Sequence, residues 1–460
     1  MALILHNTLG NKDEVFKPIK EGEVGLYTCG PTVYNYPHIG NYRAYIFGDI
    51  LKRFLIYKGY KVNHIMNITD IDDKTIRDSK IQGKSLKELT TFYTEEFFKD
   101  RDILNILPAT KYTKATEYIN EMVHIIEILL LKGFAYKSDD GSIYFDIKKD
   151  KEYGKLVNLE KKSPIDSEPQ LNNLEKKFSR INSDEYEKDN AQDFALWKAW
   201  DKNDGEVFWE TPLGKGRPGW HIECSAMSMH ELGETFDIHT GGVDNIFPHH
   251  ENEIAQSECA TGKTFANYFL HNEHLLVDGQ KMSKSTGNFY TLQDLIKINI
   301  DPIAFRYWIY TSQYGTKTNF TIEAVKGCEV ALNRLKETFQ NLESNIGSIN
   351  ENYKNRMIES MDNNLDTPKA ITILWDLVRD TTLSKEDRKA TLLDFDNIFG
   401  FDLDKIKEEI IPEEIKNLAD EREKARQEKN WTKGDELREK INLLGYEVKD
   451  TDSGSKISKI

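Results

Sequence analysis

Two segments that lie far apart in the chain carry residue types suited to binding a polyphosphate. Residues 281–285 read Lys-Met-Ser-Lys-Ser, and two ammonium groups on a short polar loop can clamp phosphate oxygens. Residues 37–41 read Pro-His-Ile-Gly-Asn, where His38 opens a predicted helix and Gly40 permits close approach of a ligand. Each segment alone is also typical of a solvated loop or a helix cap. Their combination predicts a site for the phosphates and base of a nucleotide.

A second group of side chains has the chemistry of a metal site. His249 and Glu253 stand at i and i+4, so a helix would place one above the other on the same face. Cys29 and Cys224 lie upstream, and cysteine, histidine and glutamate are all competent ligands of a four-coordinate zinc ion. Spacing alone leaves alternatives open, because His250 also shares a face with Glu253 and the cysteines are equally typical of small buried apolar side chains.

The elements around these residues predict a parallel α/β sheet. Residues 23–29 alternate as a short strand, a helix follows His38, and residues 61–68 form a second strand. This order begins a parallel sheet, and ligands bind such sheets beyond the carboxyl ends of their strands. Cys29 and Thr69, which end the two strands, would face that edge together with His38.

The rest of the chain predicts an insertion followed by helices. Residues 85–135 look helical, residues 149–192 are polar and suit an insertion, and the apolar alternation from residue 194 is expected to complete the sheet. We therefore expect a Rossmann-type parallel-sheet catalytic domain with an insertion, an all-α helical bundle and a small α+β C-terminal unit. The expected domain ranges are 1–133 and 198–280 for the halves of the catalytic domain, 134–197 for the insertion, 281–335 for the lysine loop and its surroundings, 336–407 for the bundle and 408–460 for the C-terminal unit. Within the later domains we expect helices over 292–310 and 320–407. In the C-terminal unit we expect a helix capped by Thr432 and a strand over 446–448.

The composition excludes some classes of protein. The chain has 460 residues, 38% of them hydrophobic and 30% charged, and no apolar run approaches the ~20 residues of a membrane span. Its four cysteines form no CxxC pair, and its start shows no signal peptide, so we expect a reducing, cytoplasmic environment. A formal net charge of −15 argues against indiscriminate nucleic-acid binding but leaves room for a specific RNA partner.

Several long motifs in register resemble those of the cysteinyl-tRNA synthetases, a family of class I aminoacyl-tRNA synthetases. The lysine segment matches the KMSKS signature of class I enzymes, whereas the histidine segment departs from the HIGH signature at Asn41. The resemblance covers most of the chain. Its other motifs are residues 28–34, 67–74, 218–227, 249–253, 435–438 and 448–451.

The resemblance implies that zinc selects the substrate thiolate. The family's zinc ligands correspond to Cys29, Cys224, His249 and Glu253, with one zinc per chain. Zinc deprotonates a coordinating thiol and prefers soft sulfur to a hydroxyl oxygen. An apolar pocket would separate cysteine from serine or alanine by only about 1–3 kcal/mol.

The implied reaction is the ATP-dependent activation of L-cysteine to cysteinyl-adenylate and its transfer to the 3'-terminal adenosine of tRNA(Cys), with Mg²⁺ assisting. The implied tRNA contacts are a stem-contact region over 281–335, an anticodon-stem-binding bundle over 336–407 and an anticodon-recognition unit over 408–460. Packing or capping roles stay open for three of the implied residues, Thr69, Trp220 and His239. The full implied set is His38, Asn41, Lys281 and Lys284 in catalysis, Gly40, Gly242, Asp244 and Lys284 on ATP, and Gly30, Thr32, Thr69, Trp220 and His239 on cysteine.

Two other functions are compatible with parts of the chain. A cysteine ligase acting on an amino-sugar, as in the mycothiol-pathway relatives, would lack an anticodon-binding region, so residues 340–460 count against it. A non-catalytic paralogue that binds RNA or cysteine would need neither the intact lysine segment nor the complete metal set. Ile457 stands near the place where relatives often carry a tryptophan, which leaves the reading of the anticodon open. We expect a monomer that binds ATP, L-cysteine and tRNA(Cys).

Overall fold

The computed structural model describes residues 2–157, 193–282, 287–342, 345–405, 412–451 and 454–459. The chain forms two compact units, Met1–Asp404 and Lys405–Ile460, each described here by itself. Among the described residues, no helix combines the length and the apolar character needed to cross a bilayer.

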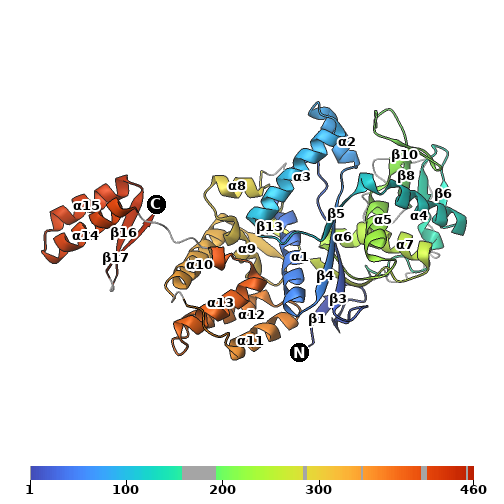
Figure 1. Ribbon diagram of the computed structural model, residues 1–460. Coiled ribbons are helices and arrows are strands. Elements are labelled where there is room, and N and C mark those ends of the chain that lie inside the picture. The colour runs from blue at the N-terminus through green and yellow to red at the C-terminus, as the bar shows by residue number, and fades with distance from the viewer. Residues whose placement is uncertain are drawn as a thin grey trace. The chain divides into compact units, whose positions relative to one another are not determined.

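A five-stranded parallel sheet forms the centre of the first unit (Figure 1). Its strand order is β12-β11-β3-β4-β5, and every neighbouring pair in it is parallel. This confirms the predicted parallel α/β sheet. The strands are β3 (Glu23–Thr28), β4 (Lys61–Ile68), β5 (Lys111–Lys114), β11 (Phe236–Gly242) and β12 (Ala266–Asn272).

Local signals in the sequence explain the helices that begin at the ligand edge of the sheet. Helix α1 (Ile39–Tyr57) follows β3 and is capped by His38, and Gly59, with φ +92°, ends it as predicted. Its buried apolar side chains, such as Ile46 and Phe54, pack into the core. Helix α2 (Asp73–Ile81) follows β4 and is capped by the carboxylate of Asp72.

The sequence had suggested that residues 85–135 are helical throughout, but in the structure they do not form one helical stretch. They divide into α3 (Leu86–Ile103), the edge strand β5 and α4 (Ile119–Lys132). Asn105, with φ +50°, follows the end of α3, and Pro108 lies between α3 and β5, so local backbone geometry interrupts the helix. Within α4 the predicted apolar stripe is buried, including Met122, Ile126 and Leu129.

The expectation that residues 194–224 complete the parallel sheet is wrong. The strands in this region form a separate antiparallel sheet of order β6-β7-β8-β10-β9, and the parallel sheet resumes only at β11. In Figure 1 this second sheet lies to the right of the parallel sheet, beside α4, α5 (Trp220–Leu232) and α7 (Glu251–Thr261). The polar segment was expected over residues 149–192, and residues 158–192 of it lie outside the described residues. The strands are β6 (Ala135–Lys137), β7 (Ile143–Phe145), β8 (Phe194–Ala199), β9 (Trp209–Thr211) and β10 (Gly214–Pro218).

The remainder of the first unit is mainly helical. The expected helix over 292–310 is two helices, because Asn299 adopts φ +58° and Asp301 caps a new helix at Pro302. A small sheet, β14-β13-β15, precedes the helices of the bundle. These elements are β13 (Leu275–Val277), β14 (Gln280–Lys281), β15 (Thr318–Phe320), α8 (Leu292–Lys297), α9 (Pro302–Tyr310), α10 (Ile322–Gln340), α11 (Glu351–Asp362), α12 (Thr367–Arg379) and α13 (Lys385–Phe399), and a hairpin of β1 (Ile4–Asn7) and β2 (Lys12–Val15) opens the chain.

The second unit is a small α+β structure, as predicted. It contains α14 (Glu413–Gln427), α15 (Trp431–Leu443), β16 (Tyr446–Thr451) and β17 (Gly454–Lys459). Asn430, not Thr432, caps α15 and accepts a hydrogen bond from the Lys433 N–H at 3.2 Å; asparagine caps at least as well as threonine. Ile457 pairs with Val448 and packs against the core of this unit.

Candidate active site

A cavity of about 410 Å³ opens at the carboxyl ends of the parallel strands. This volume is in the range of small-molecule sites, about 300–1,000 Å³. Many residues that the sequence had singled out line it together, although they come from elements that are far apart in the chain. They are Cys29, Gly30, Thr32, His38, Gly40, Asn41, Thr69, Trp220, Gly242, Asp244 and His249.

A reciprocal capping box fixes the histidine at the start of α1. The His38 N–H donates to Asn41 Oδ1 at 3.0 Å, and His38 Nδ1 accepts from the Asn41 N–H at 3.2 Å. Because Nδ1 accepts a hydrogen bond, the neutral ring carries its proton on Nε2. Asn41 therefore has a structural role that its sequence position had not revealed. A side chain at Gly40 would come within 2.9 Å of the His38 ring, so glycine permits this packing.

The lysine segment is described only at its two ends. Lys281 belongs by its backbone to β14, and Met282 lines the cavity, whereas residues 283–286, which include Lys284, lie outside the described residues. Beyond the gap, the Phe289 ring contacts the His38 ring edge-on at 5.3 Å, and the Tyr290 carbonyl accepts from the Ile39 N–H at 2.9 Å. Both described ends therefore lie at the cavity, beside the start of α1.

Two glycines, Gly241 and Gly242, end β11, which neighbours β3 on the side opposite β4. Asp244, in the short helix α6 (Val243–Asn245), lines the cavity, and a side chain at Gly242 would come within 2.5 Å of its Oδ1. A side chain at Gly241 would come within 2.8 Å of the His250 ring. Glycine at position 241 leaves room for the buried His250 ring, whereas a side chain at position 242 would require the Asp244 carboxylate to shift.

Four of the predicted metal ligands converge at the floor of the cavity. One potential ligand atom from each of Cys29, Cys224, His249 and Glu253 lies within 4.8 Å of the others. His249 Nε2 and Glu253 Oε1 are 3.0 Å apart, yet Oε1 accepts no hydrogen bond. These two atoms lie close enough together to be two ligands of one cation.

Burial keeps two of the ligands of this cluster, Cys224 and His249, uncharged in the absence of a cation. The hydrogen bond with Cys29, burial and the nearby Glu253 carboxylate together raise the pKa of the Cys224 thiol well above its usual value. Burial lowers the pKa of His249 to about 3, so its imidazole is neutral. A divalent cation would stabilise the thiolates that this environment otherwise disfavours. Soft sulfur, imidazole and carboxylate donors fit a transition metal.

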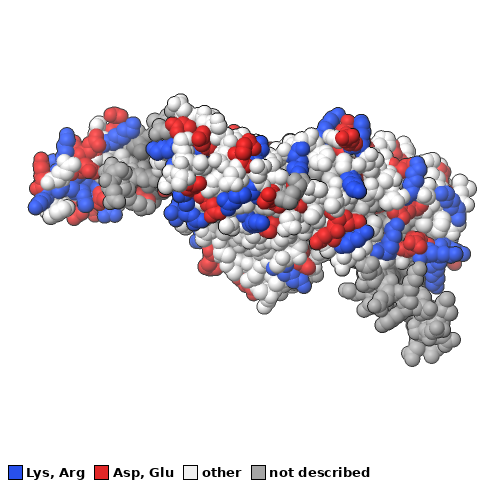
Figure 2. Space-filling view, turned by 90° about the horizontal axis from the view of Figure 1, so that it is seen from below, with Lys and Arg blue, Asp and Glu red and all other residues white. Residues whose placement is uncertain are grey.

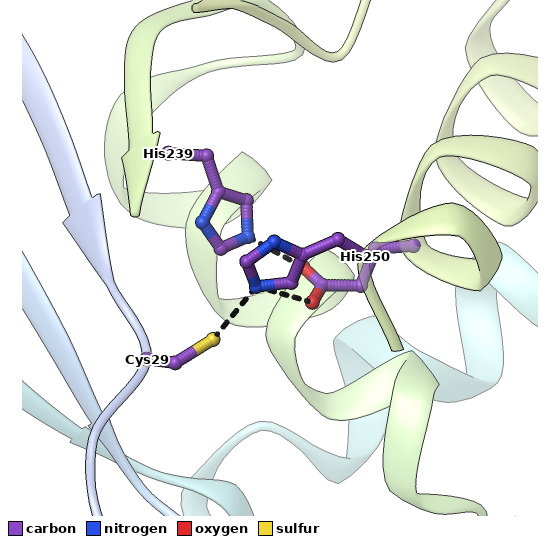
Figure 3. A group of neighbouring side chains, drawn as sticks. Cys29, His239 and His250 are labelled. Carbon is purple, nitrogen blue, oxygen red and sulfur yellow. Dashed lines mark hydrogen bonds and ion pairs between the residues drawn. The ribbon is translucent and has the colours of Figure 1, made fainter. Parts of the chain in front are cut away.

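A second set of ligand atoms overlaps the first (Figure 3). It joins Cys29 and Glu253 to His239 and His250 instead. Cys29 Sγ lies 3.2 Å from His250 Nε2, and His239 Nε2 lies 2.9 Å from Glu253 Oε2. His239 and His250 do not line the cavity, whereas His249 does. The role of His239 in cysteine binding therefore stays a prediction. In the structure, His239 contacts the carboxylate of Glu253 through Nε2.

The cavity next to the cluster is lined by both polar and aromatic side chains. The Trp220 ring stacks on His249 with ring centres 4.2 Å apart. Thr32 and Thr69 form an isolated bridge between the ends of β3 and β4. A side chain at Gly30 would meet the Asn67 carbonyl at 1.8 Å, so only glycine allows the two strands to approach there.

Comparisons with known proteins match this arrangement. The family of class I tRNA synthetase catalytic domains of the (C) type matches residues 15–329, and the cysteinyl-tRNA ligase anticodon binding domain matches residues 410–456. The chain is 46% identical to the cysteine–tRNA ligase of Brachyspira hyodysenteriae, over 99% of this chain and 98% of the relative. It is 44% identical to that of Chlamydia muridarum over 100% of both. The chain belongs to the cysteine–tRNA ligase family.

Solved structures of other class I synthetases share the fold of this family member. A leucyl-tRNA synthetase of Agrobacterium radiobacter, solved as a ternary complex, aligns with a TM-score of 0.59 at 11% identity, covering 84% of each chain. A methionyl-tRNA synthetase of Mycobacterium tuberculosis, solved with methionyl-adenylate, aligns with a TM-score of 0.54 at 13% identity, covering 82% of this chain and 90% of that one. These likenesses confirm the predicted Rossmann-type fold class.

Two polar residues near the site had been given no role from the sequence. Asn67 lies within a quoted motif, and its side chain bridges the ends of two strands. Glu251 accepts hydrogen bonds from three backbone N–H groups, those of Gly154, Leu156 and Val157, at 2.9–3.1 Å. Burial raises the pKa of Glu251 to about 7. No sequence signal identifies such residues, because most of their partners are backbone groups brought near only by the fold.

Proposed function

We propose that the chain ligates L-cysteine to tRNA(Cys) in two ATP-dependent steps. The observation that carries this proposal is the shared cavity: the metal cluster reaches it through Cys29 and His249, and the nucleotide-type residues His38 and Asp244 line it as well. One small cavity thus offers places for a thiol and for a nucleotide next to each other. Family membership supports the same reaction.

We propose one zinc ion per chain, held by Cys29, Cys224, His249 and Glu253. Two thiolates, a neutral imidazole and a carboxylate are ligands that zinc accepts. Bound there, zinc would favour a thiolate over a hydroxyl group as a further ligand, which separates cysteine from serine. The chain itself positions the ligands: His221 Nδ1 lies 3.0 Å from His249 Nδ1, and His239 holds Glu253.

The activation step then rests on the residues at the start of α1. His38 would present Nε2–H to a phosphate oxygen of ATP, and the helix N-terminus adds its partial positive charge. Lys281 and Lys284 would neutralise charge that develops on the phosphates, together with Mg²⁺, and Asp244 and Gly242 would hold the adenosine. Asn41 Oδ1 is already used by the His38 N–H, so Asn41 would act chiefly by keeping His38 in place.

The transfer step would use the second unit to select the tRNA. The match of residues 410–456 to the family's anticodon binding domain supports this assignment. It also counts against an amino-sugar as the acceptor. Over the part of the first unit that Figure 2 shows, basic and acidic side chains are intermixed, so selection would rest on specific contacts more than on a broad basic surface.

ATP–pyrophosphate exchange with each amino acid in turn tests the proposed function. We expect exchange that depends on L-cysteine, with L-serine and L-alanine as near-isosteric controls that support little or none. Exchange driven equally well by another amino acid, or by none, would contradict the proposal.

A further inference from the structure

Lys74 is the one lysine or arginine among the described residues that line the cavity of the candidate active site. It belongs to the first turn of α2, which follows β4. The proposed reaction brings several anionic groups into this cavity, and an anionic group that leaves water needs a cation or hydrogen-bond donors in exchange. The position of Lys74 therefore indicates where one of these groups lies.

A buried ion network holds the turn that carries Lys74. The Asp73 carboxylate pairs with Lys198 on β8 at 2.8 Å and with Arg217 on β10, and both cations are buried. The Asp72 carboxylate accepts a hydrogen bond from the Lys74 N–H at 2.6 Å and caps the helix. Both acidic neighbours of Lys74 are thus engaged within the protein, and they keep its backbone at the edge of the cavity.

Lys74 and the residue proposed for the adenosine of ATP lie on opposite sides of β3. The strand order is β11-β3-β4; Asp244 follows β11, His38 follows β3 and Lys74 follows β4. The ion pairs of Asp73 show that the antiparallel sheet contacts the start of α2. Lys74 therefore lies away from the adenosine of ATP, on the side of the cavity where the antiparallel sheet meets α2.

The transfer step brings in an anionic group that the activation step lacks. This inference rests on the proposed function: the terminal ribose oxygen of the tRNA forms an ester bond with the carbonyl carbon of cysteinyl-adenylate, the bond from that carbon to the phosphate oxygen breaks, AMP leaves with the electron pair, and the hydroxyl proton is lost to water. The phosphodiester before the terminal adenosine then lies within one nucleoside of the reacting carbonyl group. The proposal gives the phosphates of ATP to His38 and the lysine segment, but it gives this phosphodiester no cation.

We propose that the Lys74 ammonium group binds the phosphodiester that joins the last two nucleotides of the tRNA. An ammonium group is a compact point charge, which suits a phosphate that arrives with a flexible single strand. The contact would place the terminal ribose against the adenylate. Lys74 would thus serve the transfer of cysteine and not its activation.

Two rates of the full-length chain separate these steps. The first is cysteine-dependent ATP–pyrophosphate exchange without tRNA, and the second is single-turnover transfer from preformed cysteinyl-adenylate to tRNA(Cys). The variants are Lys74→Met, which removes the charge at similar length, and Lys74→Arg, which keeps it. Arg77→Ala is the control, because Arg77 is a cation one turn further along α2 that pairs with Asp78 and does not line the cavity.

We expect Lys74→Met to slow transfer about tenfold or more, because a contact between two charged groups is lost, and to change exchange less than about twofold. Lys74→Arg should retain most of the transfer rate, and Arg77→Ala should leave both rates within about twofold. Lys74→Gln replaces Lys74→Met should that variant not fold.

A neutral linkage in the tRNA identifies the phosphate itself. A tRNA(Cys) with a single methylphosphonate between its last two nucleotides lacks that one negative charge. This change should slow transfer by the wild-type chain about tenfold. In Lys74→Met it should cause little further loss, because the partner of the charge is already missing.

Three results would overturn the proposal. Transfer could stay unchanged in Lys74→Met. Exchange and transfer could fall equally, which would assign the lysine to ATP or to the cysteine carboxylate. The methylphosphonate could slow Lys74→Met as much as the wild-type chain, which would show that another group binds this phosphodiester. Failure of the proposed function has a different signature, because the wild-type chain would then show neither cysteine-dependent exchange nor transfer.

Discussion

At the residue scale, the choice of metal ligands shows what sequence spacing can decide. His249 and His250 both share a helix face with Glu253, so spacing left them as alternatives, and the resemblance favoured His249. The fold adds a physical reason. His249 lines the cavity, whereas His250 Nδ1 lies 2.8 Å from His271 Nε2 in the buried interior. The His249 set has two cavity-lining members, Cys29 and His249, whereas the His250 set has Cys29 alone, so a metal held by the His249 set would be more open to a substrate.

We expect Glu253→Gln to damage the selectivity of the site. Glutamine keeps the size of the side chain and its position on the helix but removes a negative charge from the metal cluster. The metal would be held more weakly and would discriminate less well between sulfur and oxygen. The preference for cysteine over serine in kcat/KM should fall about tenfold, equivalent to about 1.4 kcal/mol, measured by ATP–pyrophosphate exchange.

The matched control for this prediction is Glu258→Gln on the same helix. Glu258 pairs with Lys155 and accepts from the Phe265 N–H, away from the metal cluster. Glu251 stands closer in sequence but is unsuitable, because its buried carboxylate holds three backbone N–H groups. Wild-type selectivity in Glu253→Gln, or a loss confined to Glu258→Gln, would show that the ligand assignment is wrong.

At the element scale, a buried ion network joins the helix that starts at the active site to the helical part of the first unit. Asp49 on α1 pairs with Arg53 at 2.8 Å and with Arg306 on α9. Arg306 also donates to the Phe399 carbonyl at the end of α13, at 2.7 Å. Burial raises the pKa of Asp49, but the two guanidinium groups outweigh it and lower this pKa overall. The network ties α1 to α9 and α13.

We predict that Arg306→Met destabilises the first unit strongly. The substitution leaves the Asp49 carboxylate buried with only part of its compensating charge, and breaking a buried pair typically costs about 3–5 kcal/mol of unfolding free energy. Thermal unfolding followed by circular dichroism measures the loss. Arg379→Met on α12 is the control, because that side chain is exposed and its change should cost less than about 0.5 kcal/mol. Equal melting temperatures for both variants would refute the role of the network.

The same scale shows which parts of the fold the sequence could predict. The order β3, α1, β4 was predictable because capping residues, turn glycines and apolar periodicity act locally. The partner of β8 was not, because alternation identifies a strand but says nothing about the sheet it joins. The residues of the candidate site were predictable to the same extent as the elements that carry them. Residues at strand ends, such as Cys29 and Thr69, could be placed at one edge, whereas the bridging role of Asn67 depends on the register of β3 against β4.

At the scale of the whole molecule, the second unit offers an aromatic surface that the sequence had not drawn attention to. Ile457, which the sequence analysis singled out, is partly buried against the core of the unit. Trp431, at the start of α15, is instead 57% exposed, with the Arg426 guanidinium 5.5 Å from its ring centre. An exposed indole beside a cation is suited to stacking on a nucleic-acid base.

We expect Trp431→Ala to raise the KM for tRNA(Cys) about tenfold while cysteine-dependent ATP–pyrophosphate exchange stays unchanged. Stacking on an aromatic side chain contributes about 1–3 kcal/mol per base. Leu443→Ala is the control, since Leu443 lies on the same helix and is 86% exposed. A matching effect of both substitutions, or a loss of exchange activity in Trp431→Ala, would argue against this stacking role.

The formation of cysteinyl-tRNA by the intact chain, before and after metal removal, is the most direct test of a metal-dependent cysteine ligase. The chain should charge total tRNA with radiolabelled cysteine and ATP, lose most of this activity after dialysis against a chelator, and regain it on addition of zinc. Metal analysis should find about one zinc per chain in the active protein. Undiminished charging by metal-free protein, or charging with serine at a comparable rate, would contradict this account.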